Sequence, residues 1–216
     1  MDFTRLEAFL QQLALNNHKA WFDEHREAYQ ELRVDFLSFI DELIKDASRI
    51  DGQLASLEAK NCIFRINRDV RFSANKNPYK TNFSAYLSKG GKKFPGAGYY
   101  FHFEPGASFL AAGIWMPEAP LLKQIRQEID YGWLEFKEIV GNAQVQGLRF
   151  EGEQLSRPPK GYEPTHEAIE FLRYKSFILS EPFEMKQADL QMHFVKRIDD
   201  LKPLVYFLNQ AVASES

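Results

Sequence analysis

Apolar residues recur at helical spacing along the first fifty residues of the chain. In residues 3–13 the apolar positions fall on a single face of a helix. A second apolar stripe extends from Trp21 to Ile44, opposite a face of charged residues, and Asn17 is expected to be its N-cap. The pattern therefore predicts two helices in the N-terminal part of the chain.

The spacing of apolar residues changes to alternation after residue 60, which is typical of strands. The first of these runs, CIFRI, predicts a short strand in which Cys62 is a buried, unreactive residue. A type II turn with Pro105 and Gly106 at its centre predicts a hairpin. Strands are expected at 62–66, 82–88, 98–104, 107–116 and 144–152. Together they predict an antiparallel sheet of four or five strands.

Helical patterns return from residue 118 and continue toward the C-terminus. A loop rich in proline precedes a helix that is expected to begin near Thr165 or His166. Two more helices are expected after residue 186, with Pro203 in the first turn of the second one. The last third of the chain is therefore predicted to be mainly helical.

Length and composition favour a single α+β domain spanning residues 1–216. The chain is 44% hydrophobic and long enough to bury a core without disulfides. We expect a helical part at 1–50, the sheet and a basic segment at 61–116, and a mainly helical part at 117–216. No signal peptide or membrane-spanning run is present, so the sequence predicts a soluble, cytoplasmic protein without membrane partners.

The sequence contains no motif of a P-loop NTPase, a Rossmann oxidoreductase or an α/β-hydrolase. It lacks a P-loop, a GxGxxG after a strand and a GxSxG nucleophile elbow. Its single cysteine and the spacing of its five histidines do not match a zinc site. We therefore expect neither a cofactor nor a metal, and the residues do not decide between a binding protein and an enzyme.

Positive charge is concentrated in one segment of an acidic chain. The net charge of the chain is −3, but residues 65–93 contain eight lysines and arginines and one acidic residue, Asp69. Charge segregated in this way creates a local positive field that attracts anions. A protein that coats nucleic acid usually has a basic domain as a whole, and this chain does not.

The basic segment contains the residue types of an anion site. Arginine binds planar anions with two hydrogen bonds, and lysine supplies a point charge. We expect Asp69 to orient Arg68, and the hydroxyl of Tyr79 to donate a hydrogen bond to the ligand. The residues predicted to bind a phosphate-like anion, a phosphorylated small molecule or a nucleotide are Arg65, Arg68, Arg71, Lys76 and Lys80. In the alternative interpretation, these arginines pair with carboxylates elsewhere in the fold.

Three residues are candidates for proton transfer if the protein is an enzyme. Tyr79 lies within the basic segment. His102 shares a strand face with Tyr100 and Glu104, an arrangement that suits a proton-transfer pair or a polar sheet surface. His166 lies at a predicted helix start, where a histidine either caps the helix or acts as an acid or base. The sequence does not choose among them.

The basic segment resembles the signature of a known family. The pattern RxxRDxRFxxxKxxY from Arg65 to Tyr79 is similar to that of the domain of unknown function 2461 family of bacterial proteins. The blocks NNHKAWFDEHR, GYYFHFEPGASFLAAGIWMP and PPKGYEPTHEAIEFLRYKSF resemble its other recurring blocks, so the likeness covers nearly the whole chain. The last block departs from the family pattern at Thr165 and Glu167, where an acid and a proline are common. The resemblance implies a shared site but no particular activity.

Two other classes of function compete with a small-anion site. In a nucleic-acid-binding module, Lys89, Lys92 and Lys93 would extend the basic surface. The rings of Tyr79, Phe83 or Tyr86 would then offer stacking faces for bases. In an interaction domain, the motif would be purely structural, and neutralising Arg68 would unfold the protein. Salt dependence separates the first two, because contacts to many phosphates weaken steeply with ionic strength.

Overall fold

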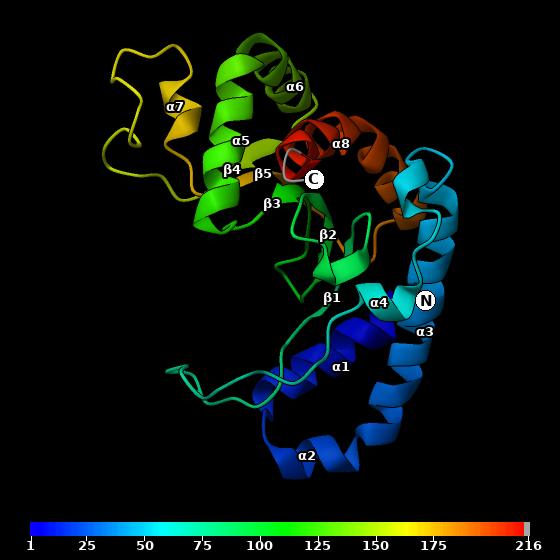
Figure 1. Cartoon of the computed structure of the whole chain (residues 1–216). Helices are drawn as coiled ribbons and strands as arrows, with labels where there is room; N and C mark the ends of the chain where they lie inside the picture. Colours follow the sequence, from blue (N-terminus) through cyan, green and yellow to red (C-terminus); the bar gives the residue numbers. More distant parts are fainter. Residues whose placement is uncertain (214–216) are drawn as a thin grey trace.

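Within residues 1–213, the computed structural model has eight α-helices, two short 3₁₀ turns and one five-stranded sheet. The helices are α1 (Phe3–Leu15), α2 (Lys19–Glu24), α3 (Arg26–Ala47), α4 (Ala59–Cys62), α5 (Ala119–Tyr131), α6 (Trp133–Val145), α7 (Ile169–Leu172) and α8 (Leu190–Ala213). The 3₁₀ turns are η1 (Gly52–Leu54) and η2 (Gly91–Lys93), and the strands are β1 (Phe83–Leu87), β2 (Gly98–Phe103), β3 (Phe109–Ile114), β4 (Arg149–Glu151) and β5 (Phe177–Pro182). Figure 1 shows α1 and α2 at one end of the molecule, α5, α6 and α7 at the other, and the sheet and α8 between them. The predicted α+β class is confirmed.

The sheet has the order β1-β2-β3-β5-β4, and all its neighbouring strands are antiparallel. The β2–β3 hairpin is present as predicted, and Gly106 in its turn has the positive φ of 72° that a type II turn requires. The sequence pattern missed β5, which lies between β3 and β4. Its polar residues Ser180 and Glu181 are buried, so the strand lacks the usual alternation of apolar and polar positions.

The second predicted N-terminal helix is divided in two. Helix α2 ends at Glu24 and α3 begins at Arg26, with His25 between them. The N-cap of α2 is His18, so the prediction of Asn17 as N-cap is wrong. Asn17 instead bonds the backbone of Tyr79: its side chain donates to the Tyr79 carbonyl at 3.0 Å and accepts from the Tyr79 amide at 3.1 Å. This clamp attaches the basic segment to the helical end of the molecule.

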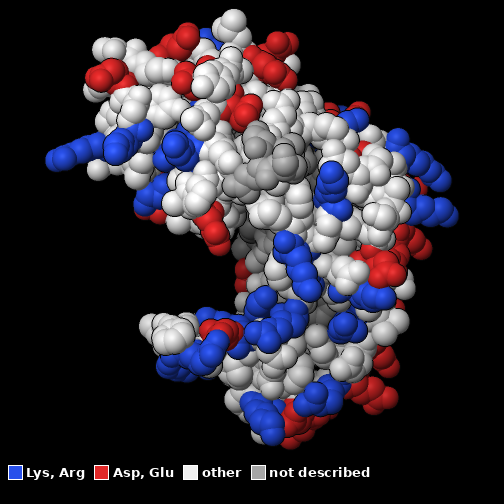
Figure 2. Space-filling view, in the orientation of Figure 1, with Lys and Arg blue, Asp and Glu red and all other residues white. Residues whose placement is uncertain are grey.

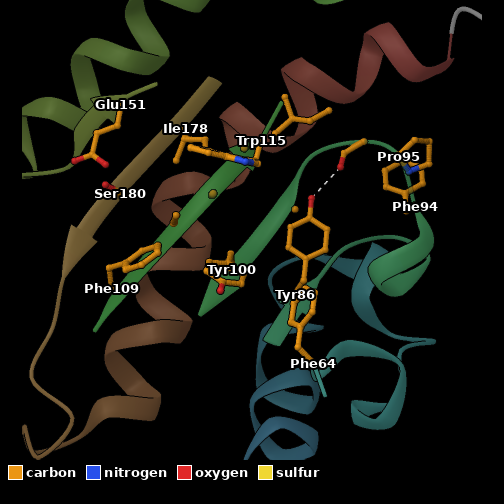
Figure 3. A pocket seen from close by; sticks show the side chains of 16 residues that line it. Phe64, Tyr86, Phe94, Pro95, Tyr100, Phe109, Trp115, Glu151, Ile178 and Ser180 are labelled. Carbon is orange, nitrogen blue, oxygen red and sulfur yellow. Dashed lines mark hydrogen bonds between the residues drawn. The ribbon is translucent and has the colours of Figure 1, made fainter. Parts of the chain in front are cut away.

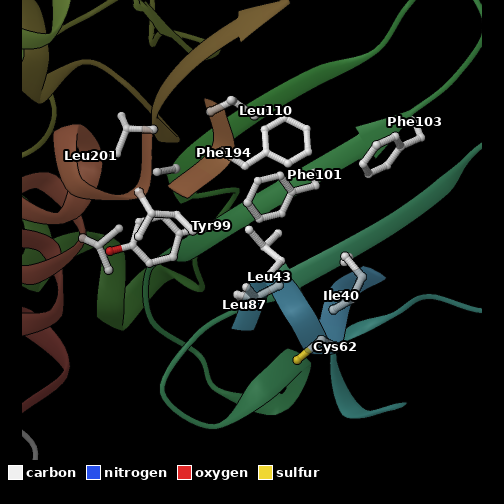
Figure 4. Packing of buried hydrophobic residues seen from close by; sticks show 14 of the residues in the cluster. Ile40, Leu43, Cys62, Leu87, Tyr99, Phe101, Phe103, Leu110, Phe194 and Leu201 are labelled. Atoms are coloured by element: carbon white, nitrogen blue, oxygen red, sulfur yellow. The ribbon is translucent and has the colours of Figure 1, made fainter. Parts of the chain in front are cut away.

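The core lies on one face of the sheet, under α3 and α8. Tyr99, Phe101 and Phe103 alternate along β2 and point toward these helices (Figure 4). The ring of Phe103 lies within 6.1 Å of five other rings, those of Phe3, Phe36, Phe39, Phe183 and Phe194. Aromatic rings at these separations pack edge to face or offset, as in other aromatic cores. Six of the 19 phenylalanines of the chain belong to this cluster.

The C-terminal helix is continuous where the sequence predicted a break. Pro203 lies inside α8, so the prediction that it occupies the first turn of a separate helix is wrong. Proline in a helix loses one backbone hydrogen bond. The apolar residues on both sides of Pro203, among them Ile198 and Leu208, are buried and hold the helix on the core. No helix in the described part of the chain is long and apolar enough to cross a membrane.

The segment before β1 is not the predicted strand. Cys62 ends α4, and only single bridges follow, Ile63 with Ala85 and Asn67 with Tyr79. The backbone of 66–80 folds back on itself as an irregular hairpin, with hydrogen bonds from Lys80 to Ile66 and from Arg68 to Pro78. Strict alternation of faces therefore fails here. Phe72, which lies in this hairpin, is 97% exposed.

Cys62 is expected to be unreactive in the folded protein. Its side chain is fully buried, and burial raises the pKa of the thiol to about 11, so little thiolate forms at neutral pH. The measurement is the rate of reaction with a disulfide reagent at neutral pH, in buffer and in denaturant. We expect reaction to be slow in buffer and complete in denaturant. Fast reaction of the folded protein would contradict the buried position.

Candidate functional site

The face of the sheet that points away from α3 and α8 is hollowed by small residues. Strand register places Gly98 opposite Gly113 and Tyr100 opposite Ala111 on this open face. Gly113 has a φ of +130°, and a Cβ atom there would lie 1.9 Å from the carbonyl oxygen of Phe177 on β5. Glycine is therefore required for the close pairing of β3 and β5, and it also leaves the floor of the hollow flat.

The hollow is a cavity of about 560 Å³, large enough for a small molecule. Its walls are mainly aromatic and apolar (Figure 3). Phe64 and Tyr86 stand on one side, and Trp115 and Ile178 on the other, with Tyr100 between them. An apolar floor with aromatic walls suits a flat ring or another apolar group.

Two lysines lie at the Phe64 side of this cavity, and Arg65 is close enough to lower the pKa of one of them. The ammonium groups of Lys80 and Lys92 lie 5.2 and 5.4 Å from the centre of the Phe64 ring. Lys92 also donates a hydrogen bond to the carbonyl of Ile63. Burial, reinforced by the charges of Arg65 and Lys92, lowers the pKa of Lys80. Within residues 1–213 none of these three cations has a carboxylate partner in an ion pair.

The remaining basic residues of the motif lie toward the tip of the 66–80 hairpin and bond locally. Asp69 holds Arg71 with two hydrogen bonds, at 2.9 Å to Nε and 2.6 Å to Nη2. The guanidinium of Arg68 contacts the Ser73 hydroxyl at 3.4 Å, so Asp69 orients an arginine as predicted, but this arginine is Arg71 and not Arg68. The Lys76 ammonium bonds the carbonyl of Val70 at 3.1 Å. The predicted cluster is thus divided between the rim of the cavity and an exposed tip.

Figure 2 shows where these charges lie on the surface. Lys and Arg side chains gather on the projecting segment at 65–80 and on the surface just above it, around the inner side of a deep concavity. The opposite end of the molecule, over α5 and α6, carries many acidic side chains in this view. The segregation of charge in the sequence is therefore also a segregation in space.

Tyr79 is part of the fold and does not line the cavity. It is buried, its ring stacks on Phe22 at 4.0 Å, and both backbone polar groups bond to Asn17. A buried ring in this position is not available to a ligand in the cavity. The prediction of Tyr79 as a hydrogen-bond donor or proton-transfer residue is therefore replaced by a structural role.

His102 belongs to a hydrogen-bonded chain that ends at the cavity. Its Nδ1 lies 2.9 Å from the hydroxyl of Tyr100, and its Nε2 lies 3.0 Å from Oε2 of Glu104. The Thr81 hydroxyl donates to the other oxygen of Glu104. The His102 ring stacks on Phe109, with 4.8 Å between ring centres. The strand-face arrangement of residues 100, 102 and 104 is thus present, and Tyr100 is the member that lines the cavity.

His166 lies away from the cavity, between α5 and the loop before α7. Its Nε2 bonds Asp130 at 2.9 Å, and its Nδ1 accepts the amide of Ala168 at 3.1 Å. The carboxylate that bonds His166 therefore comes from α5. The residues next to His166 in the sequence, at positions 165 and 167, are threonine and glutamate. Helix α7 begins at Ile169, after the predicted start. With both ring nitrogens bonded, His166 anchors the loop.

Sequence reasoning did not assign three residues of the site to it: Phe64, Lys92 and Tyr100. Phe64 is the residue before Arg65, and Lys92 comes from η2. No sequence spacing joins these positions, because η2 contacts α4 and β1 only in the folded chain. For Tyr100 the signal was present in its alternation with His102 and Glu104.

Comparison with known proteins identifies a family. A family model described as "Conserved hypothetical protein (DUF2461)" matches residues 5–207, nearly the whole chain. The chain has no detectable match among curated proteins or among solved structures. The match includes the basic segment, the hairpin and the loop before α7, on which the resemblance rested. The chain therefore belongs to the domain of unknown function 2461 family of conserved hypothetical proteins.

Proposed function

We propose that the open face of the sheet binds a small molecule that combines an apolar or aromatic group with an anionic group, such as a phosphate. The observation that carries this proposal is the position of Phe64. It lines the apolar cavity, and the ammonium groups of Lys80 and Lys92 lie over its ring. A ligand ring in the cavity would place an attached phosphate beside these cations.

Electrostatics supports an anion at this place. Burial is the main cause of the lowered pKa of Lys80, and the like charges of Arg65 and Lys92 add to it. A bound phosphate would remove the repulsion and supply hydrogen-bond acceptors for lysine and arginine. Cation sites that are unfavourable in the free protein and compensated by a ligand are common at functional sites. The proposal is thus a refined form of the predicted anion site, centred on Arg65, Lys80 and Lys92.

One observation favours a second candidate, binding of single-stranded nucleic acid. Phe72 is almost fully exposed at the tip of the basic hairpin, and the Arg71 guanidinium lies 5.9 Å from its ring centre. An exposed ring beside arginine is a suitable stacking platform for a base. In that case the strand would contact the tip as well as the rim, and affinity would fall steeply with salt.

The test is a thermal-shift and calorimetric titration at two salt concentrations. The probes are phenyl phosphate, inorganic phosphate, benzyl alcohol, adenosine monophosphate and a short oligonucleotide. A probe at a hundred times its Kd stabilises the fold by about 2.7 kcal/mol. For a chain of this size that is a rise in Tm of about 5–10 °C. We expect phenyl phosphate or the nucleotide to exceed both inorganic phosphate and benzyl alcohol, with weak salt dependence.

Lys80→Met is expected to weaken phenyl phosphate binding about tenfold or more, because it removes one charge-assisted hydrogen bond and keeps the aliphatic chain. Lys76→Met is the matched control: it removes the same charge from the tip of the hairpin, away from the cavity. We expect this control to change the Kd by less than about twofold, since exposed distant charges are screened. The measurement is calorimetric titration of both variants.

Equal losses in the two variants would exclude the rim as the binding site. Steep salt dependence, with oligonucleotide binding reduced in both, would favour the nucleic-acid candidate. Absence of stabilisation by every anion would favour an interaction domain with a structural motif.

A further inference from the structure

The two tyrosines on the open face differ in what their hydroxyl groups contact. Tyr86 and Tyr100 lie opposite each other on β1 and β2, and both line the cavity. The Tyr86 hydroxyl donates to the carbonyl of Gly96 at 2.9 Å, and a carbonyl does not take up the proton. The Tyr100 hydroxyl instead contacts the imidazole of His102, a group that does.

We propose that Tyr100 is a catalytic proton-transfer residue, which removes a proton from a phosphorylated ligand held over the sheet, and that His102 and Glu104 act through it. This proposal rests on the ligand class of the proposed function and adds a reaction to it. The chain Glu104–His102–Tyr100 has the same logic as other triads, in which an acid orients a base and the base activates a hydroxyl.

The hydrogen-bond partners determine the direction of proton flow. The Glu104 carboxylate accepts a hydrogen bond from Nε2–H of His102, and the Thr81 hydroxyl donates to the other carboxylate oxygen. With the proton on Nε2, Nδ1 carries a lone pair and accepts the Tyr100 O–H. Stacking on Phe109 keeps the imidazole in this orientation. The chain therefore draws the phenol proton away from the cavity.

The proposed step balances without any further reactant. As the ligand loses a proton to Oη of Tyr100, the phenol proton passes to Nδ1 of His102, and the resulting imidazolium is stabilised by the Glu104 carboxylate. Reversal returns the proton to the product. Burial raises the pKa of Tyr100, and a hydrogen bond from Ser84 opposes the rise. A free phenolate is therefore disfavoured, and the two proton transfers are expected to be concerted.

The test uses a reagent that needs no phosphate, phenylmethanesulfonyl fluoride, on the full chain. Oη of Tyr100 attacks sulfur, the S–O bond forms, fluoride leaves, and the phenol proton moves to His102. Peptide mapping by mass spectrometry gives the labelling rate at each tyrosine. We expect Tyr100 to react much faster than Tyr86 or the exposed Tyr131. A general base contributes about 10²–10⁴-fold, so Glu104→Gln is expected to slow labelling on the order of a hundredfold.

Three controls give the test its meaning. Tyr131→Phe, which removes an exposed hydroxyl that does not line the cavity, is expected to leave Tyr100 labelling unchanged. In the unmodified protein, the labelling rate is expected to follow the fraction of neutral His102, measured by NMR of the imidazole across pH. This second measurement needs no variant, so it decides the question even if Glu104→Gln folds poorly. Labelling in buffer that contains no phosphate is expected to remain fast, which separates this proposal from the anion site.

Labelling of Tyr100 at the same rate as Tyr131, or independent of the protonation of His102, would overturn the proposal. Fast, His102-dependent labelling in a protein that binds no phosphate would support the proton chain and refute the ligand class. Phosphate binding with an unreactive Tyr100 would support the proposed function alone.

Discussion

Phe103→Ala is expected to lower the free energy of unfolding by about 3–5 kcal/mol. The Phe103 side chain is fully buried, and rings from β2, α1, α3, α8 and the segment after β5 meet around it. Truncation removes the transfer free energy of the ring and leaves a cavity that elements from distant parts of the chain cannot fill without moving. The measurement is denaturant unfolding followed by circular dichroism.

Phe72→Ala is the matched control for this prediction. It makes the same chemical change at a ring that is almost fully exposed, so we expect a change within about 0.5 kcal/mol. A large loss from Phe72→Ala would mean that the tip of the basic hairpin is packed against something in solution. A small loss from Phe103→Ala would mean that the aromatic cluster is not the core.

Glu181→Ala is expected to cost about 3–5 kcal/mol, because it leaves the partly buried guanidinium of Arg197 without its main partner. Glu181 is 8% exposed, and its Oε2 lies 2.7 Å from Nη2 of Arg197. The other oxygen, Oε1, accepts from Nε of Arg197 at 2.9 Å and from His193 at 2.7 Å. Asp200 also pairs with Arg197, at 3.1 Å, so part of the network survives the change. Denaturant unfolding again measures the loss.

Glu58→Ala provides the corresponding control at the surface. Its carboxylate lies 2.8 Å from the Lys60 ammonium, but both side chains are exposed, so we expect a loss of less than about 1 kcal/mol. The double variant Glu181→Met, Arg197→Met is expected to lose less than the sum of its two single variants, because neither Glu181 nor Arg197 is then left buried without the other. Additive losses would show that the two residues act independently.

Phe103 and Glu181 both contact the helices that cover one face of the sheet. Helices α3 and α8 hold β2 and β5 through the aromatic cluster and the Glu181–Arg197 pair. The strands are therefore anchored from one side only. The open face has small residues at Gly98, Ala111 and Gly113 and a cavity above them. The core does not depend on these positions, because it lies on the other face.

Local patterns in the sequence predicted much of the fold. The apolar stripe of residues 3–13, the Pro105–Gly106 turn and the alternation along 98–104 are each determined by neighbouring residues, and each is present in the structure. The family was also recognisable from local motifs. The failures have physical causes of their own. Strand β5 was not predicted because its buried polar residues break the usual alternation of apolar and polar positions. Backbone hydrogen bonding between Ile66 and Lys80 forms an irregular hairpin where a strand was predicted.

The sequence by itself determined the fold class, the family and the presence of a basic segment, because these depend on composition and on spacing over a few residues. Only the tertiary structure decided which charges act together. It placed Lys80 and Lys92 over Phe64, moved Arg71 and Lys76 to an exposed tip, and buried Tyr79. It also joined Tyr100 to His102 at the edge of a cavity. Contacts between residues far apart in the chain arise from packing against the core, and no local pattern encodes them.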